Sequence, residues 1–289
     1  MLIAELRVSR AAKPVARRCR VTFLLRKLSA VTQWQGEHYR DIAKPQRSLA
    51  SGTLSSLLLE GHERVLDVGC GDGTITMQLA DRISPPGGVV GIDPSSSMIA
   101  AARKLGANRP NVDFHIGDVL TMRYRQEFDL VVSFNALHWV HDLAMAFQRI
   151  AEALIDGARA VLQFVCAGDR PSLEEVIAAT CQNERWHRSF TSFRQPYEHR
   201  RPDTLRALAG SAKLTVTRLS VDDDMWNFGS RDGFAAWCQG TFGPWTDGWS
   251  AEAKDQFIND VLDAYESVIG APGVFRFLQA RIHAERRQR

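Results

Sequence analysis

The chain carries the stretch VLDVGCGDGT at residues 65–74, and its local pattern specifies one kind of supersecondary unit. Residues 65–68 are apolar except for Asp67, which is typical of the end of a buried strand. Three glycines follow at alternate positions: Gly69, Gly71 and Gly73. Residues 74–80 then have the apolar spacing of a helix. Strand, glycine turn and helix in this order open a nucleotide-binding α/β fold, because glycine lets the backbone bend sharply and approach a ligand closely.

The spacing of the glycines indicates which ligand. A dinucleotide site has Gly-x-Gly-x-x-Gly, whereas here the third glycine comes one residue early and Thr74 stands in its place. Asp67 adds a negative charge, which suits a cationic ligand better than a pyrophosphate. The stretch resembles the first motif of class I S-adenosylmethionine (SAM) methyltransferases. The resemblance implies SAM as cofactor, S-adenosylhomocysteine (SAH) as product, and a binding turn made of Asp67, Gly69, Cys70, Gly71 and Gly73.

The rest of the chain up to residue 165 alternates between strands and helices. Strands are expected at about 63–68, 88–93, 111–116, 127–134 and 159–165, and helices at about 73–83, 95–106 and 142–155. This alternation predicts a mostly parallel sheet covered on both faces. Together with the resemblance, which covers about 65–165, it predicts an α/β, Rossmann-like sheet of seven strands with a small helical cap.

The pattern changes after residue 165. Helices are expected at 171–186, 202–211, 230–239 and 250–269, strands at 214–221 and 273–282, and an early helix at 44–60. Five of the seven tryptophans lie in this second half, where they either pack a cap or line an apolar pocket. We expect one methyltransferase domain at 31–289, with a core at 61–165 and the cap and last strands at 166–289.

Residues 1–30 form a basic extension that we expect to be poorly ordered. They hold eight Lys or Arg against one acid, Glu5, although the whole chain of 289 residues has a net charge of only +3. The extension has three interpretations: a mitochondrial presequence, an arm for nucleic acid or a membrane surface, or a plain extension. The small overall charge predicts no nucleic-acid partner, and no stretch is long and apolar enough to predict a membrane span.

The cysteines and histidines predict neither disulfides nor a metal. Five cysteines are scattered without a Cys-x-x-Cys pair, and the eight histidines lack metal-ligand spacing. Reduced thiols favour the cytoplasm, with mitochondria as the alternative if the basic extension is a presequence. We expect a monomer, with a dimer as the alternative, acting on a small-molecule acceptor.

Two acids follow later strands of the expected sheet. Asp93 ends VVGID, 20 residues after Gly73, where a carboxylate can accept hydrogen bonds from both ribose hydroxyls. With Pro94 and Ser95 after it, Asp93 is alternatively a helix N-cap acid. Open α/β sheets bind ligands at this edge, so we place Asp93 and Pro94 in the cofactor site.

The second acid, Asp118, follows the third expected strand in HIGDV. The resemblance implies that its carboxylate accepts a hydrogen bond from the adenine amino group. It also implies that Met98 and Val119 lie on the two sides of the adenine ring. The alternative interpretation of Asp118 is an ordinary turn residue.

The stretch SFNALHWVHD at 133–142 follows the fourth strand. Asn135 is expected to begin a loop over the methionine part of SAM, and His138 and Trp139 to face the acceptor. With Trp34, Tyr39, Gln46 and Arg47 upstream, this stretch resembles juvenile hormone acid methyltransferases and, more loosely, trans-aconitate methyltransferases. Both families methylate carboxylates. The resemblance implies a small carboxylic acid as acceptor, which the aromatic residues after 165 predict to be hydrophobic, and adds Tyr39 and Gln46 to the cofactor site.

Such a reaction requires no general base, because a carboxylate is already ionised at neutral pH and a sulfonium methyl is already electrophilic. Gln46 and Trp139 each offer an uncharged N–H donor that could hold the carboxylate. His138 is the alternative, as a base for a hydroxyl acceptor. Hydroxyl, amine and carbon acceptors stay open, as do RNA methylation through the basic arm and a SAM-binding scaffold without activity.

Overall fold

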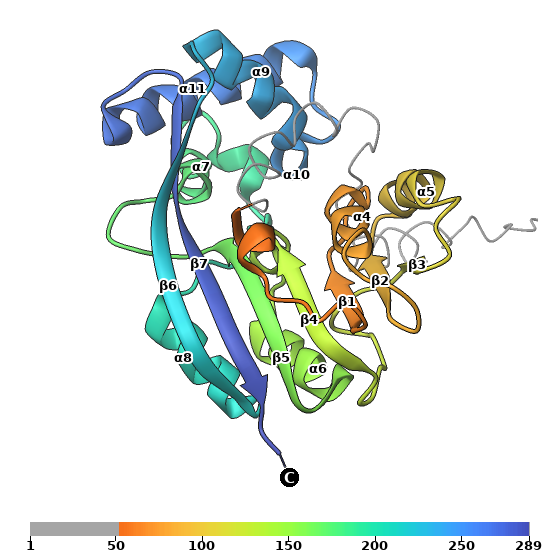
Figure 1. Ribbon diagram of the computed structural model, residues 1–289. Helices are drawn as coiled ribbons and strands as arrows, with labels where there is room; N and C mark the ends of the chain where they lie inside the picture. Colours follow the sequence, from red (N-terminus) through yellow and green to blue (C-terminus); the bar gives the residue numbers. More distant parts are fainter. Residues whose placement is uncertain (1–51, 289) are drawn as a thin grey trace, which may run out of the picture. The chain divides into compact units, whose positions relative to one another are not determined.

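The computed structural model describes residues 52–288, and its centre is a seven-stranded sheet in the order β3-β2-β1-β4-β5-β7-β6 (Figure 1). The strands are β1 Arg64–Val68, β2 Gly88–Asp93, β3 Val112–Ile116, β4 Phe128–Phe134, β5 Leu154–Val165, β6 Leu214–Asn227 and β7 Val274–Arg286. Strands β1 to β5 pair in parallel, whereas β7 runs antiparallel to both β5 and β6. The expected Rossmann-like, mostly parallel sheet of seven strands is confirmed.

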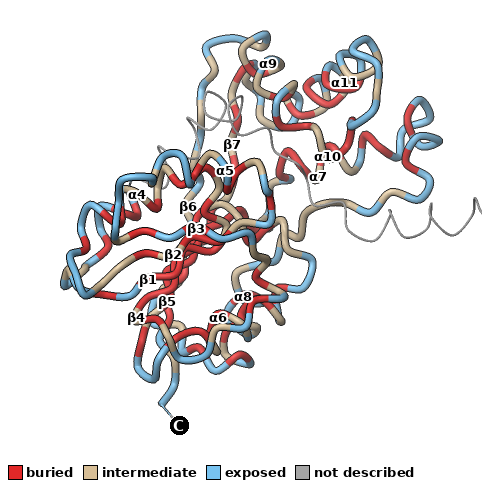
Figure 2. Tube along the Cα trace, turned by 90° about the vertical axis from the view of Figure 1, so that its right-hand side faces the viewer, coloured by how far each residue is buried: buried red, intermediate tan, exposed pale blue. Residues whose placement is uncertain are grey.

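Helices cover both faces of this sheet. The first pair, α4 Thr74–Ala80 and α5 Ser96–Leu105, packs on one face, and α6 Leu143–Ala153 and α8 Pro202–Ser211 pack on the other. Successive residues of β1 point to opposite faces, so Val65 joins the core beneath α4 and Leu66 joins the core beneath α6. The strands are therefore buried on both sides, as the continuous buried path through the sheet in Figure 2 shows.

The remaining helices form the cap, which lies beyond the carboxyl ends of the parallel strands (Figure 1). The cap comprises α7 Leu173–Thr180, η2 His187–Phe190, α9 Arg231–Thr241, α10 Gly243–Thr246 and α11 Ala251–Ile269. Its core is rich in aromatic side chains: Trp186, Phe190, Phe234, Phe242, Trp245, Phe257, Tyr265, Phe275 and Phe277. Most aromatics of the second half of the chain thus pack the cap, as one of the two sequence interpretations expected.

Several expected boundaries are wrong. The helix expected at 171–186 ends at Thr180, and the chain turns before η2. Strand β5 begins directly after α6, at Leu154, because Leu154 pairs with Phe128 across a bulge. Of the helix expected at 44–60, the described part is helical only at 52–56.

The last two strands are longer than expected. They pair from Leu214↔Arg286 to Asn227↔Val274, with a bulge between Val216 and Arg218, and thus reach from the sheet to the cap. The acids at 222–224 conceal the strand pattern in the sequence. In the structure, Asp222 pairs with Arg281 at 2.6 Å, across the two strands, so the charges stabilise the extension.

Candidate functional site

The glycine turn connects β1 to α4 and has a left-handed backbone at all three glycines. The φ angles are +76° at Gly69, +54° at Gly71 and +80° at Gly73, a region that glycine enters without steric cost. A Cβ on Gly69 would lie 2.2 Å from the Cβ of Ala136, whereas a Cβ on Gly71 would meet no atom of residues 52–288 within 4 Å. The loop after β4 can therefore approach the turn at Gly69, and Gly71 leaves open space among the described residues.

Asp93, at the carboxyl end of β2, supports this turn. One carboxylate oxygen accepts the backbone N–H of Gly71 at 3.1 Å, and the other accepts the N–H of Ser95 at 2.8 Å. Ser95 itself caps α5, so Asp93 acts at a helix start as the alternative interpretation had it. Each oxygen keeps a further lone pair for a ligand hydroxyl. Burial raises the pKa of Asp93, against the two backbone hydrogen bonds that lower it.

Asp67 lies deeper, behind the turn. Its carboxylate is buried and accepts a hydrogen bond from the Thr76 hydroxyl at 2.7 Å, which ties the end of β1 to α4. Burial raises the pKa of Asp67 to about 7; the Thr76 hydrogen bond opposes the rise and the nearby Asp93 adds to it. A cationic ligand close to Asp67 would favour the ionised carboxylate.

The raised pKa of Asp67 predicts how stability depends on pH. In the folded protein Asp67 stays protonated up to a pH near its pKa of about 7, whereas in the unfolded chain it ionises near pH 3.8. The stability that the protonated Asp67 contributes to the folded state is therefore lost as the pH rises through its folded pKa of about 7. Asp67→Asn keeps the acceptor for Thr76 and cannot ionise. We expect urea unfolding of the ligand-free protein to show the variant gaining stability relative to wild type between pH 5 and pH 8. A constant difference between the two proteins would contradict a raised pKa.

The residues expected around adenine follow β2 and β3. Asp118 accepts the backbone N–H of Leu120 at 2.8 Å, so its carboxylate also fits the turn interpretation. Met98, in the first turn of α5, and Val119 are buried, whereas Pro94 is exposed. All four come from segments at the carboxyl edge of the sheet, beside Asp93.

The loop after β4 rests on the glycine turn. Ser133 donates its hydroxyl proton to the carbonyl of Val68 at 2.8 Å, directly before Gly69. Asn135 follows with φ +55°, and its backbone N–H donates to the carbonyl of Gln163 at 2.7 Å. The short helix η1 Leu137–Trp139 comes next. The structure therefore brings Asn135, His138 and Trp139 to the edge where the glycine turn and Asp93 lie.

Five rings form a closed aromatic circuit between η1 and the cap: His138, Trp139, Trp245, Tyr197 and His199. Neighbouring ring centroids are 5.1, 6.1, 6.4, 4.6 and 6.0 Å apart in that order, closing from His199 back to His138. The backbone N–H of Glu198 also donates to the carbonyl of His138 at 2.7 Å. Tyr197 and His199 were not predicted from the sequence, because they lie in a segment without periodic pattern.

The two imidazoles of this circuit are neutral at physiological pH. Burial, with a smaller effect of His199, lowers the pKa of His138 well below 6.5, and burial lowers the pKa of His199 to about 4. His199 Nδ1 lies 3.2 Å from the hydroxyl of Ser172. Within residues 52–288, His138 Nδ1 and His199 Nε2 have no hydrogen-bond partner.

The predicted residues Tyr39 and Gln46 lie outside the described part of the chain, as do Trp34 and Arg47.

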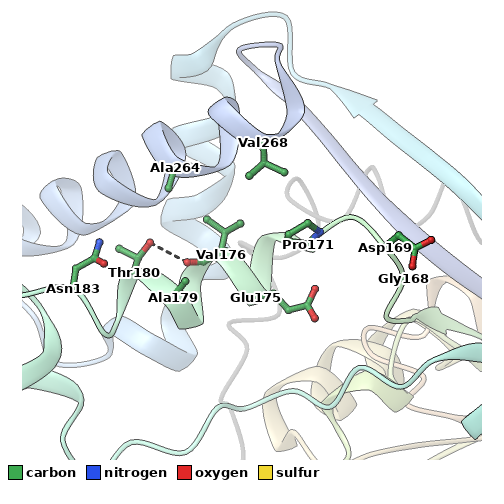
Figure 3. Close-up of a pocket in the computed structure, with 10 residues that line it drawn as sticks. All are labelled: Gly168, Asp169, Pro171, Glu175, Val176, Ala179, Thr180, Asn183, Ala264 and Val268. Carbon is green, nitrogen blue, oxygen red and sulfur yellow. Dashed lines mark hydrogen bonds between the residues drawn. The ribbon is translucent and has the colours of Figure 1, made fainter.

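A separate groove of about 510 Å³ lies between α7 and α11 (Figure 3). Asp169, Glu175 and Val268 are among its lining residues, and it includes none of the predicted site residues. No helix between residues 52 and 288 is long and apolar enough to cross a membrane. In the same range, no group of three His, Cys, Asp or Glu side chains could hold a metal ion.

Comparisons with known proteins agree with this geometry. Residues 59–214, more than half of the chain, match the family described as methyltransferase domain. The trans-aconitate 2-methyltransferase of Deinococcus radiodurans is 33% identical over 162 residues, which are 55% of this chain and 60% of that protein. The juvenile hormone acid O-methyltransferase of Bombyx mori is 36% identical over 132 residues, 43% of this chain and 45% of that protein.

The chain thus spans less than two thirds of the length of these two relatives. Among solved structures, the YcgJ protein of Bacillus subtilis has a TM-score of 0.63 at 17% identity, over 84% of this chain and 100% of that one. The family match and the sheet order confirm the resemblance predicted from the glycine motif. The chain therefore belongs to the methyltransferase domain family and is a Rossmann-like, SAM-dependent methyltransferase.

Proposed function

We propose that this enzyme methylates the carboxylate of a small, hydrophobic acid. The observation that carries the proposal is the aromatic circuit, which contains donors without net charge and begins two residues after Ala136, the residue that packs against Gly69. Trp139 carries an indole N–H, and His138 and His199 are neutral because their pKa values are lowered by burial. Uncharged donors can orient a carboxylate and leave its negative charge in place, whereas a lysine would neutralise that charge.

The two relatives support the same class of acceptor, since their names specify trans-aconitate and juvenile hormone acid. In this proposal the core at 61–165 binds the cofactor, and the cap, which with the last strands makes up 166–289, encloses the acceptor, within a catalytic domain at 31–289. The described cysteines, Cys70, Cys166, Cys181 and Cys238, are buried thiols, which supports a reducing compartment such as the cytoplasm.

The cofactor fits the residues that are present. Gly71 leaves open space beside the turn, and Asp93 holds lone pairs for ribose hydroxyls. When bound, SAM supplies an electrophilic methyl group on a sulfonium. The protein then has to orient the acceptor oxygen in line with that methyl and exclude water, and both tasks suit a buried aromatic surface.

The acceptor class is tested with labelled SAM and a panel of small acids, alcohols and amines. We expect methyl esters to form, and His138→Asn to retain ester formation within about tenfold of wild type. A hydroxyl acceptor that used His138 as base would lose about 10²–10⁴-fold in the variant. Transfer to alcohols or amines only would overturn the proposal, and SAH binding without any transfer would favour a scaffold.

Trp139→Phe tests the indole donor. The variant keeps an aromatic ring in the circuit but loses the N–H together with the second ring of the indole. The loss of one hydrogen bond to a charged group alone should lower kcat by about tenfold. SAH affinity measured by calorimetry should stay unchanged. Trp226→Phe, on the edge strand β6, is the matched control and should change neither quantity. Unchanged turnover of Trp139→Phe would remove this residue from the acceptor site.

A further inference from the structure

Two buried glutamines interrupt the apolar strands β5 and β7. Gln163 and Gln279 are both 0% exposed. The Gln163 amide nitrogen donates to Gln279 Oε1 at 2.7 Å, and the Gln279 amide nitrogen donates to Asn135 Oδ1 at 2.6 Å. Thr53 donates its hydroxyl proton to Gln163 Oε1 and thereby ends the series. We call Thr53, Gln163, Gln279 and Asn135 the amide chain.

Burying amides in the centre of a sheet costs free energy unless their hydrogen bonds are made. Both glutamines use their oxygen and their nitrogen within the amide chain, so the cost is offset. An apolar pair of the same shape would remove both amides together, so the main cost in stability would be that the buried Thr53 hydroxyl loses Gln163 Oε1 as its acceptor. The fold alone therefore does not require glutamine at these positions. The orientation of the Asn135 side chain does require it, because Gln279 donates the hydrogen bond to Asn135 Oδ1.

Two hydrogen bonds to the described glutamines hold Asn135 in a left-handed backbone conformation. Its side chain accepts from Gln279, its backbone N–H donates to the carbonyl of Gln163, and its φ of +55° turns the chain sharply after β4. A left-handed backbone at a residue other than glycine persists only where surrounding contacts enforce it. The next residue, Ala136, occupies the space that a Cβ on Gly69 would fill. The position of Asn135 therefore fixes how the loop lies against the glycine turn.

We propose that Gln279 is a positioning residue for the cofactor site. Its amide, oriented by Gln163, holds Asn135 in place, and Asn135 in turn sets the loop over the glycine turn. The inference rests on the proposed place of the amino-acid part of the cofactor at that turn. Gln279 lies on β7, which comes after the cap in the chain, and it is thus far in sequence from every residue predicted to bind the cofactor.

The test removes the amide chain without leaving a cavity. Gln279→Met keeps the side-chain length, and the double variant Gln163→Met/Gln279→Met also removes the donor that the single variant leaves unpaired. We expect the double variant to melt within a few degrees of wild type and to bind SAH about tenfold more weakly, as the loss of one hydrogen bond predicts. A purely structural role predicts the reverse: a lower melting temperature with unchanged SAH affinity in the folded protein.

A double-mutant cycle then shows whether Gln279 acts through Asn135. Asn135→Gly accepts the left-handed backbone and lacks the side chain. In that background we expect Gln279→Met to change the SAH dissociation constant less than twofold. Independent, multiplicative effects on SAH affinity would overturn the inference. So would a double methionine variant that binds SAH as wild type does. Failure of the wild-type protein to bind SAH would instead refute the cofactor assignment itself, so the two failures are distinguishable.

Discussion

Gly71→Ala will weaken SAH binding by up to about a hundredfold while the protein stays folded. The left-handed backbone at Gly71, with φ +54°, costs an alanine about 1–2 kcal/mol, and its Cβ meets no atom of the described residues within 4 Å. The methyl group therefore enters the space where we place the amino-acid part of the cofactor. Overpacking a bound group in this way costs about 1–3 kcal/mol, which at its upper end is about a hundredfold in affinity. Calorimetry with SAH and thermal unfolding measure the two effects separately.

The chain offers a matched control at the end of α11. Gly270 has φ +73°, and a Cβ there would also meet nothing within 4 Å. Gly270→Ala should thus lower the stability as much as Gly71→Ala and leave SAH affinity unchanged. If both variants bind SAH like the wild type, the backbone at Gly71 does not approach the ligand.

Asp93→Asn is the second substitution from which we expect a large loss of SAH affinity. A carboxylate that accepts hydrogen bonds from both ribose hydroxyls contributes about 1.5–3 kcal/mol for each bond. An amide offers one oxygen, which the N–H of Gly71 or Ser95 already requires. We expect the SAH dissociation constant to rise by about a hundredfold, because one hydroxyl then faces an N–H donor.

Asp118→Asn is the comparison, since an amide oxygen accepts from an adenine amino group as a carboxylate does; SAH affinity should fall only a few-fold. The raised pKa of Asp93 adds a pH dependence to the wild type. Protonation converts one acceptor oxygen into a donor, so SAH affinity should fall as the pH is lowered, and at a higher pH than for an ordinary carboxyl group. Equal affinities of Asp93→Asn and wild type at pH 8 would exclude ribose binding by Asp93.

The cofactor half of the fold could be predicted because its signals are local. The glycine turn, the acid that ends β2 and the loop after β4 each follow directly from a strand, and parallel strands bring their carboxyl ends to one edge. The acceptor side depends on tertiary proximity instead. Trp245 meets both Trp139 and Tyr197 only because the cap folds over η1, and no local pattern encodes these contacts.

The amide chain also could not be predicted from local sequence patterns. Gln163 and Gln279 look like ordinary interruptions of apolar strands, and only the antiparallel pairing of β5 with β7 brings them together. The acids at 222–224 likewise obscured the length of β6, because their arginine partners lie on β7 and before α7. In each case the partner is distant in sequence, so a window of neighbouring residues does not contain the information.

The cap helices and the glycine turn lie in separate parts of the chain. Every cap helix is inserted either between β5 and β6 or between β6 and β7, and the chain returns to the sheet after each insertion. The glycine turn, both acids and the loop after β4 precede the first insertion. A change in the length or sequence of an insertion therefore alters the cap without interrupting the segment that carries the glycine turn.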